Sequence, residues 1–116
     1  MNTEEIFLPI KGFEGLYEIG FAGTARNVKT GRILKYAISN MGYKYVDLNK
    51  NGIKKHMLVH RLVASAFLFN RANQLYVDHI NNDRTDNNVS NLRFCTYEEN
   101  RHNSKFDETI PAMQSV

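Results

Sequence analysis

The chain has a single cysteine, Cys95, among its 116 residues. One thiol excludes an internal disulfide and a zinc site built from several cysteines, so the hydrophobic core alone must stabilise the fold. No stretch approaches the roughly 18 apolar residues that a membrane-spanning helix requires. The N-terminal segment MNTEEIF is acidic and lacks the basic-then-apolar order of a signal peptide. We therefore expect a cytoplasmic protein with no membrane partner.

The length of the chain predicts one compact domain, or two small modules that share a core. Its hydrophobic content of 42% favours a folded protein. The net charge of +3 is unevenly distributed, because segment 21–61 has nine basic residues and one acidic residue, Asp47. That segment has a local charge of +8, and the remainder of the chain sums to −5.

Such a density of basic residues is typical of proteins that bind the phosphate backbone of nucleic acids. The alternative is a solvated sheet surface whose lysines keep the protein soluble. The candidate DNA contacts are Arg26, Lys29, Arg32, Lys35, Lys44, Lys54, Lys55 and Arg61.

The first half of the chain alternates short apolar segments with Gly and Asn turns, which predicts an antiparallel β meander. Its strands are expected at 16–19, 24–28, 32–37, 43–48 and 53–59. Asn51-Gly52 is the strongest hairpin signal, because a type I′ turn needs positive φ at both central residues.

In the second half of the chain, the spacing of the apolar residues changes. Apolar residues at 62, 63, 66 and 67 follow helical spacing and predict a helix over 60–68. Strands are expected at 75–77 and 92–95, on either side of a polar loop. Thr96 and Glu99 form a capping box, which predicts a helix with Asn100 one turn inside it. The residues beyond 105 show no periodicity and are expected to be a frayed tail.

Asp78 and His79 follow the apolar run 75–77 and are the most informative pair in the sequence. A strand, a loop, a second strand and a helix can bring Asp78 and Asn100 together as oxygen ligands of a hard divalent cation. His79 can accept a proton from water near neutral pH. Neighbouring strand residues point to opposite faces, so we expect the strand to break here and both side chains to line one cleft.

These residues carry a resemblance to a known family. The segments VHRLVASAF and VDHINNDRTDNNVSNLRFCTYEEN resemble the HNH nuclease core of phage and intron-encoded homing endonucleases. Upstream, IKGFEGLYEIG and RNVKTGRILK resemble the small β module that precedes this core. The resemblance implies an α+β fold with an N-terminal antiparallel β meander, a helix and a ββα-metal nuclease core. The expected boundaries are a basic β module over 1–59, the nuclease core over 60–105 and a tail over 106–116.

The resemblance also implies roles for five residues. His79 would activate water, and Asp78 with Asn100 would hold Mg²⁺ or Mn²⁺, since an amide oxygen at Asn100 favours these ions over Zn²⁺. Asn91 would tie the loop and orient His79, and Arg93 would clamp a phosphate oxygen. The alternatives are a turn-forming Asn91, a solvent-facing Arg93 and an exposed helix residue at Asn100.

The expected function is a metal-dependent endonuclease that acts on double-stranded DNA, in the bacterial host cell of a phage or mobile element. One metal centre cuts one strand, so a monomer would nick and a homodimer would cut both strands. The alternative is a non-catalytic DNA-binding module of HNH descent in regulation, packaging or recombination. A chain that had lost catalysis would be expected to lose Asp78 or His79. His60 and Asn87 are interpreted as structural residues.

Relatives that recognise long sites append a helical DNA-binding module after the nuclease core. This sequence extends about a dozen residues past that core. We therefore expect low sequence specificity, or specificity supplied by the β meander or by a partner protein.

Overall fold

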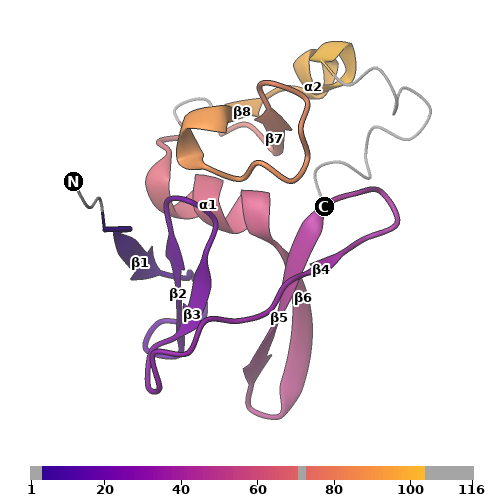
Figure 1. The fold of residues 1–116 in the computed structure, drawn as a ribbon. Helices are drawn as coiled ribbons and strands as arrows, with labels where there is room; N and C mark the ends of the chain where they lie inside the picture. Colours follow the sequence, from indigo (N-terminus) through magenta and orange to yellow (C-terminus); the bar gives the residue numbers. More distant parts are fainter. Residues whose placement is uncertain (1–3, 71–72, 104–116) are drawn as a thin grey trace.

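The structure, a computed structural model, describes residues 4–70 and 73–103 (Figure 1). The tail predicted over 106–116 lies outside the described residues. No helix in the described ranges is long and apolar enough to span a membrane.

The N-terminal half forms two antiparallel three-stranded sheets. The first contains β1 (Phe7–Pro9), β2 (Tyr17–Gly20) and β3 (Ala25–Asn27), in that order. The second contains β4 (Ala37–Ile38), β5 (Lys44–Lys50) and β6 (Ile53–Leu58). The predicted antiparallel meander is therefore present, but it is divided between two sheets.

The division falls where a strand was expected at 32–37. There, Ile33 forms an isolated bridge to Arg26 of the first sheet, and Ala37 already belongs to β4 of the second sheet. Ile33 and Tyr36 are exposed, and only Leu34 of this segment packs against the hydrophobic cluster. β1 was not expected from the sequence, and it exists through its pairing with β2, in which Leu8 is opposite Ile19.

The hairpin of β5 and β6 follows the sequence prediction. Asn51 and Gly52 have φ of 53° and 79°, the two positive values that a type I′ turn requires. This turn places the exposed Lys54 and Lys55 at the start of the returning strand.

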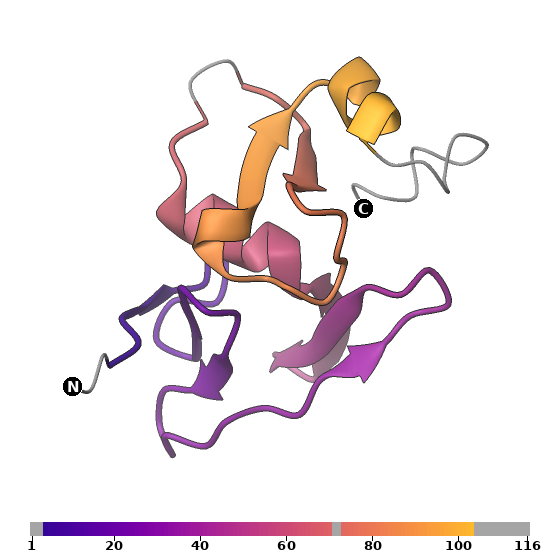
Figure 2. The ribbon, with the colours of Figure 1, turned by 45° about the horizontal axis from the view of Figure 1, so that its top comes forward.

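Helix α1 (Val59–Phe67) lies at the centre of the molecule. Figures 1 and 2 show it between the two sheets on one side and the hairpin of β7 and β8 on the other. Val59, Leu62 and Val63 on this helix are buried. They belong to one hydrophobic cluster with Ile19 and Leu48 of the two sheets, and with Val77 and Leu92 of the hairpin.

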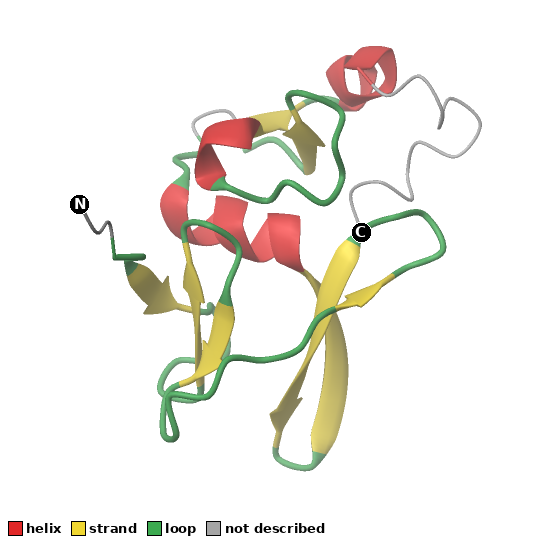
Figure 3. Cartoon of the chain, viewed as in Figure 1, coloured by secondary structure: helices red, strands yellow, loops and turns green. Residues whose placement is uncertain are grey.

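The C-terminal half begins with β7 (Tyr76–His79) and continues through a loop and a short 3₁₀ helix, η1 (Val89–Asn91). The pairing strand β8 (Leu92–Cys95) and helix α2 (Tyr97–Asn103) follow (Figure 3). The predicted capping box is confirmed. Thr96 Oγ1 accepts from the Glu99 amide at 3.2 Å, and Glu99 Oε1 accepts from the Thr96 amide at 2.9 Å.

The predicted α+β class is confirmed by this order of antiparallel sheets, helix and hairpin. The division into modules at residue 59 stays a prediction. Because the hydrophobic cluster contains residues from both sides of that boundary, the two segments share one core.

Candidate active site

The β7–β8 hairpin holds the Asp78–His79 pair. In its antiparallel register Asp78 is opposite Arg93 and His79 is opposite Leu92. β7 runs through His79 and turns only afterwards, where the Asn82 amide donates to the His79 carbonyl at 2.9 Å. β7 therefore does not break between Asp78 and His79, contrary to the expectation from the sequence. The Asp78 carboxylate is nevertheless close enough to His79 to act on its pKa.

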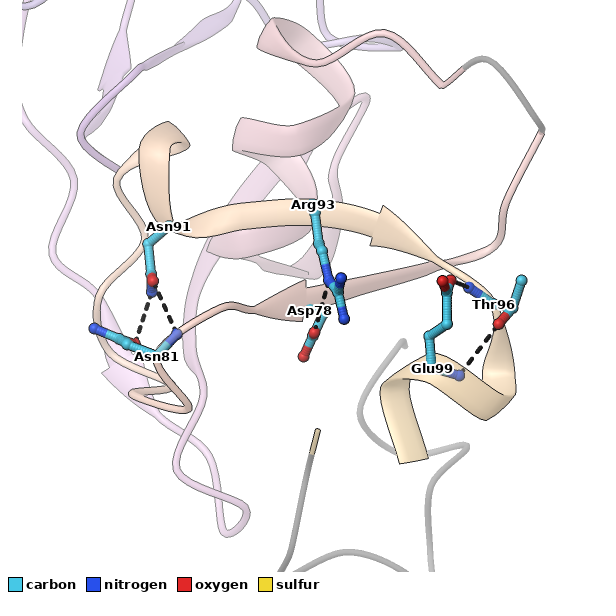
Figure 4. A network of polar contacts seen from close by, with 6 residues as sticks. All are labelled: Asp78, Asn81, Asn91, Arg93, Thr96 and Glu99. Carbon is cyan, nitrogen blue, oxygen red and sulfur yellow. Dashed lines mark hydrogen bonds and ion pairs between the residues drawn. The ribbon is translucent and has the colours of Figure 1, made fainter. Parts of the chain in front are cut away.

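Asp78 is a buried carboxylate, only 4% exposed. Its Oδ2 accepts a hydrogen bond from Arg93 Nε at 3.0 Å (Figure 4). A charge-assisted bond of this kind fixes the orientation of the carboxylate. The Arg93 side chain remains about half exposed, so it both holds Asp78 and reaches the surface.

His79 is 5% exposed, and its Nε2 lies 2.7 Å from Oδ1 of Asn87. An amide oxygen only accepts, so Nε2 carries the proton and Nδ1 holds the lone pair of the neutral ring. Burial lowers the pKa of His79, and the Asn87 hydrogen bond and the Asp78 carboxylate oppose this shift. The lowered pKa favours the neutral ring, the form that can accept a proton from water.

Asn87 is the candidate site residue that the sequence did not single out. It was interpreted as a turn residue, but it is 4% exposed and contacts His79 directly. Its Nδ2 is buried and makes no hydrogen bond within the described part of the chain. The sequence offers no signal that separates Asn87 from the other asparagines of this loop.

Asn91 closes the same loop. Its Nδ2 donates to Asn81 Oδ1 at 3.0 Å and to the Asp86 carbonyl at 2.9 Å. Its Oδ1 accepts from the Asn81 amide at 3.1 Å (Figure 4). Asn91 therefore has the geometry to tie the loop, whereas His79 donates its hydrogen bond to Oδ1 of Asn87.

Replacing Asn91 with alanine should destabilise the protein. The change removes three hydrogen bonds from a buried side chain and leaves the Asp86 carbonyl without this donor, which costs about 1–3 kcal/mol. Denaturant unfolding measures the loss. Asn49→Ala, a change at an exposed position of β5, is the matched control. Equal stability of the two variants would contradict the role of Asn91.

Asn100 lies in α2, which packs against the Asp78 strand β7. It is 1% exposed, so the alternative of an exposed helix residue does not hold. Its Nδ2 is buried without a hydrogen-bond partner in the described part of the chain. Only the Oδ1 atom of this amide could bind a cation, because Nδ2 is a hydrogen-bond donor. The position of Asn100 on a helix that packs against the strand of the buried Asp78 is compatible with a ligand pair.

The donor set also bears on which cation fits. No group of three His, Cys, Asp or Glu residues suited to a metal occurs within residues 4–70 and 73–100. One carboxylate and one amide are few ligands, and Mg²⁺ commonly keeps several waters and binds through one or two carboxylates. The residues present therefore fit Mg²⁺ or Mn²⁺.

The predicted DNA contacts fall into two groups. Arg26 pairs with Glu18, Arg61 donates to the Leu75 carbonyl at 2.9 Å, and Lys44 lies over the Tyr36 ring. The other residues are exposed: Lys29, Arg32, Lys35, Lys54 and Lys55. The second group is accessible to a phosphate backbone, and DNA contact by either group stays a prediction.

Two family models match this chain in succession. Residues 5–49 match the NUMOD4 motif, and residues 57–102 match an HNH endonuclease model. The second match contains Asp78, His79, Asn91 and Asn100, and the first contains both β1 and most of β5.

Curated relatives show the same likeness. The chain is 38% identical over 101 residues to DNA endonuclease I-HmuI of Bacillus phage SP01. The matched segment covers 87% of this chain and 58% of that protein. It is 32% identical over 113 residues to H-N-H endonuclease F-TflI of Escherichia phage T5, covering 90% and 57%.

A solved structure, described as DNA binding and cleavage by the HNH homing endonuclease I-HmuI, superposes with a TM-score of 0.78 at 37% identity. The match covers 84% of this chain and 56% of that one. The chain thus spans somewhat more than half the length of these relatives. On these matches, the chain belongs to the HNH homing endonuclease family and carries a NUMOD4 motif ahead of the HNH segment.

Proposed function

We propose that this protein is a DNA endonuclease that hydrolyses phosphodiester bonds with His79 as the general base. One observation carries the proposal. His79 is buried next to the buried Asp78 in the segment that matches the HNH model, and its Nε2–H donates to Asn87 Oδ1. Plasmid DNA incubated with Mg²⁺ and wild-type protein, beside His79→Ala, tests it.

His79 would accept the proton of the attacking water at Nδ1. Because Asn87 holds Nε2, the tautomer is set before substrate arrives and costs no reorganisation during the reaction. The lowered pKa keeps the ring in its basic form at neutral pH. General-base catalysis of this kind contributes about 10²–10⁴-fold in rate.

Asp78 and Asn100 would hold the Mg²⁺ or Mn²⁺ ion. The bound ion would stabilise charge on the phosphoryl group and on the leaving oxygen. Arg93 fixes the Asp78 carboxylate through Nε. The exposed half of the Arg93 side chain is accessible to a substrate phosphate.

A single site of this kind in each chain would cut one DNA strand. A nick is therefore the expected product of a monomer, and a break of both strands would need a homodimer or two successive nicks. Phages are the source of two similar proteins, and the cytoplasm of a bacterial host is the compartment that we propose.

The β5–β6 hairpin supplies part of the DNA-binding surface in this proposal. Reversing the charge at Lys54 and Lys55 to glutamate should weaken DNA binding and flatten its salt dependence. Both lysines are exposed, and removing one lysine–phosphate ion pair lowers the slope of log K against log salt by about 0.9. Gel shifts at several salt concentrations measure this slope.

A variant with arginine at both positions keeps the charge and is the matched control. Unchanged binding and an unchanged slope in the double glutamate variant would place the DNA elsewhere on the protein.

The alternative function is a DNA-binding module that no longer cuts. Asp78 and His79 are both retained, and both are buried with defined hydrogen-bond partners. This retention favours the nuclease, and a protein that shifts DNA in a gel without cutting it would favour the alternative.

A further inference from the structure

His79 packs in a buried cluster with two further aromatic rings, those of Tyr43 and His60. The ring centroids of Tyr43 and His79 lie 6.0 Å apart with an interplanar angle of 29°. Tyr43 also stacks on His60 at 5.1 Å, and the His60 and His79 centroids are 4.9 Å apart. Tyr43 is 4% exposed and His60 is 1% exposed, so solvent is excluded from the cluster.

Three segments of the chain supply these rings. Tyr43 precedes β5, His60 lies in the first turn of α1 and His79 ends β7. Tyr43 lies within the segment that matches the NUMOD4 motif, outside the segment that matches the HNH model. The N-terminal segment therefore reaches the proposed general base itself.

Tyr43 is held in place from both sides. Its amide donates to Ser39 Oγ at 3.2 Å, and its carbonyl accepts from the Ser39 amide at 2.8 Å. From the other side, Arg84 of the loop after β7 lies over the Tyr43 ring at 5.0 Å and donates to the Met41 carbonyl at 2.6 Å. Gly42 has φ of 88°, a conformation that suits glycine and lets the chain turn here.

We propose that Tyr43 is a positioning residue for His79, contributed by the NUMOD4 segment to the nuclease site. The bond that Nε2 of His79 donates to Asn87 Oδ1 fixes the direction of one ring nitrogen. The Tyr43 ring, stacked at 29° to the His79 ring, fixes the plane of that ring, and aromatic rings prefer such offset contacts. Together they aim Nδ1 in one direction.

This inference rests on His79 being the general base, and it adds that the N-terminal segment does more than bind DNA. A small misplacement of a catalytic group can cost about 10²-fold in rate. Loss of the Tyr43 ring should therefore lower the rate of the chemical step and leave DNA affinity unchanged.

The test compares three variants of the full chain. Tyr43→Leu removes the ring and keeps an apolar side chain, whereas Tyr43→Phe keeps the ring and removes only the hydroxyl. Tyr45→Leu is the matched control, because Tyr45 lies two residues away and contacts His56 instead of His79. Single-turnover nicking of supercoiled plasmid with Mg²⁺ gives the maximal rate and the protein concentration at half saturation.

We expect Tyr43→Leu to lower the maximal rate by about 10- to 100-fold with the half-saturation concentration unchanged. Tyr43→Phe and Tyr45→Leu should cut at the wild-type rate. The proposal would be overturned if Tyr43→Leu kept the wild-type maximal rate, whether or not its half-saturation concentration rose.

NMR of the ring protons supplies a readout independent of activity. Wild-type protein should show an NOE between the Tyr43 and His79 rings, and His79 ring signals shifted upfield by the Tyr43 ring current. The upfield shift should persist in Tyr43→Phe and disappear in Tyr43→Leu. Absence of the NOE in wild-type protein would overturn the proposal even if Tyr43→Leu failed to fold.

The experiments distinguish failure of the His79 proposal from failure of the Tyr43 proposal. Undiminished cutting by His79→Ala would refute the general base, whereas the NOE of the wild-type protein would remain. Loss of cutting in His79→Ala with full cutting in Tyr43→Leu would refute the positioning role alone.

Discussion

His79→Ala should lower the single-turnover rate of DNA cutting by about 10²–10⁴-fold, the usual contribution of a general base. DNA affinity should stay close to that of wild-type protein. The imidazole is buried and held by Asn87, so its loss removes proton transfer without removing a charged surface group.

The measurement is the nicking rate on supercoiled plasmid, with gel shifts in EDTA to follow binding. His56→Ala is the matched control, because His56 is an exposed histidine on β6, paired with Asp47. An equal loss of cutting in both variants, or a parallel loss of binding in His79→Ala, would contradict the role of His79 as base.

The second large effect is expected for Asp78→Asn, which should lower cutting by about 10²–10³-fold, the range for removing one electrostatic partner of a transition state. Asparagine has nearly the same shape and still offers an oxygen to Arg93 Nε. The change therefore removes a negative charge and leaves the hairpin in place. Cation binding should weaken together with activity.

Electron paramagnetic resonance of bound Mn²⁺ measures the cation directly, without DNA. Asp83→Asn is the control, since Asp83 is an exposed carboxylate in the following loop and accepts hydrogen bonds from Thr85. If Asp78→Asn bound Mn²⁺ as tightly as wild-type protein, Asp78 would not be a ligand of the ion.

Short-range features of this fold were predictable from sequence. The Asn51-Gly52 turn depends on two residues that tolerate positive φ, and both adopt it. The capping box of Thr96 and Glu99 depends on a three-residue spacing, and both of its hydrogen bonds form. Local chemistry decides such features, so a local pattern reveals them.

Features that depend on distant partners were not predictable. β1 exists because β2 pairs with it, and the strand expected over 32–37 is reduced to one bridge at Ile33 and to Ala37 at the start of β4. The order of polar residues in the loop likewise did not reveal that Asn87, rather than Asn91, contacts His79. Only the folded loop turns one asparagine toward the core and another toward the loop backbone.

The site itself was partly predictable. The motif predicted that Asp78 and His79 lie at the end of a strand and that a helix carries Asn100. The ion pair of Asp78 with Arg93 required the register of β7 against β8. The stack of Tyr43 on His79 joins residues 36 positions apart in sequence, and no periodicity in the sequence predicts it.

The most direct test of the proposed function is incubation of supercoiled plasmid with purified wild-type protein in Mg²⁺, in Mn²⁺ and in EDTA. We predict open circles with either metal ion and intact supercoiled plasmid with EDTA. Equal nicking in EDTA would contradict a cation held by Asp78 and Asn100. Plasmid that stays supercoiled under all three conditions, while a gel shift shows it bound, would contradict the endonuclease and favour the DNA-binding module.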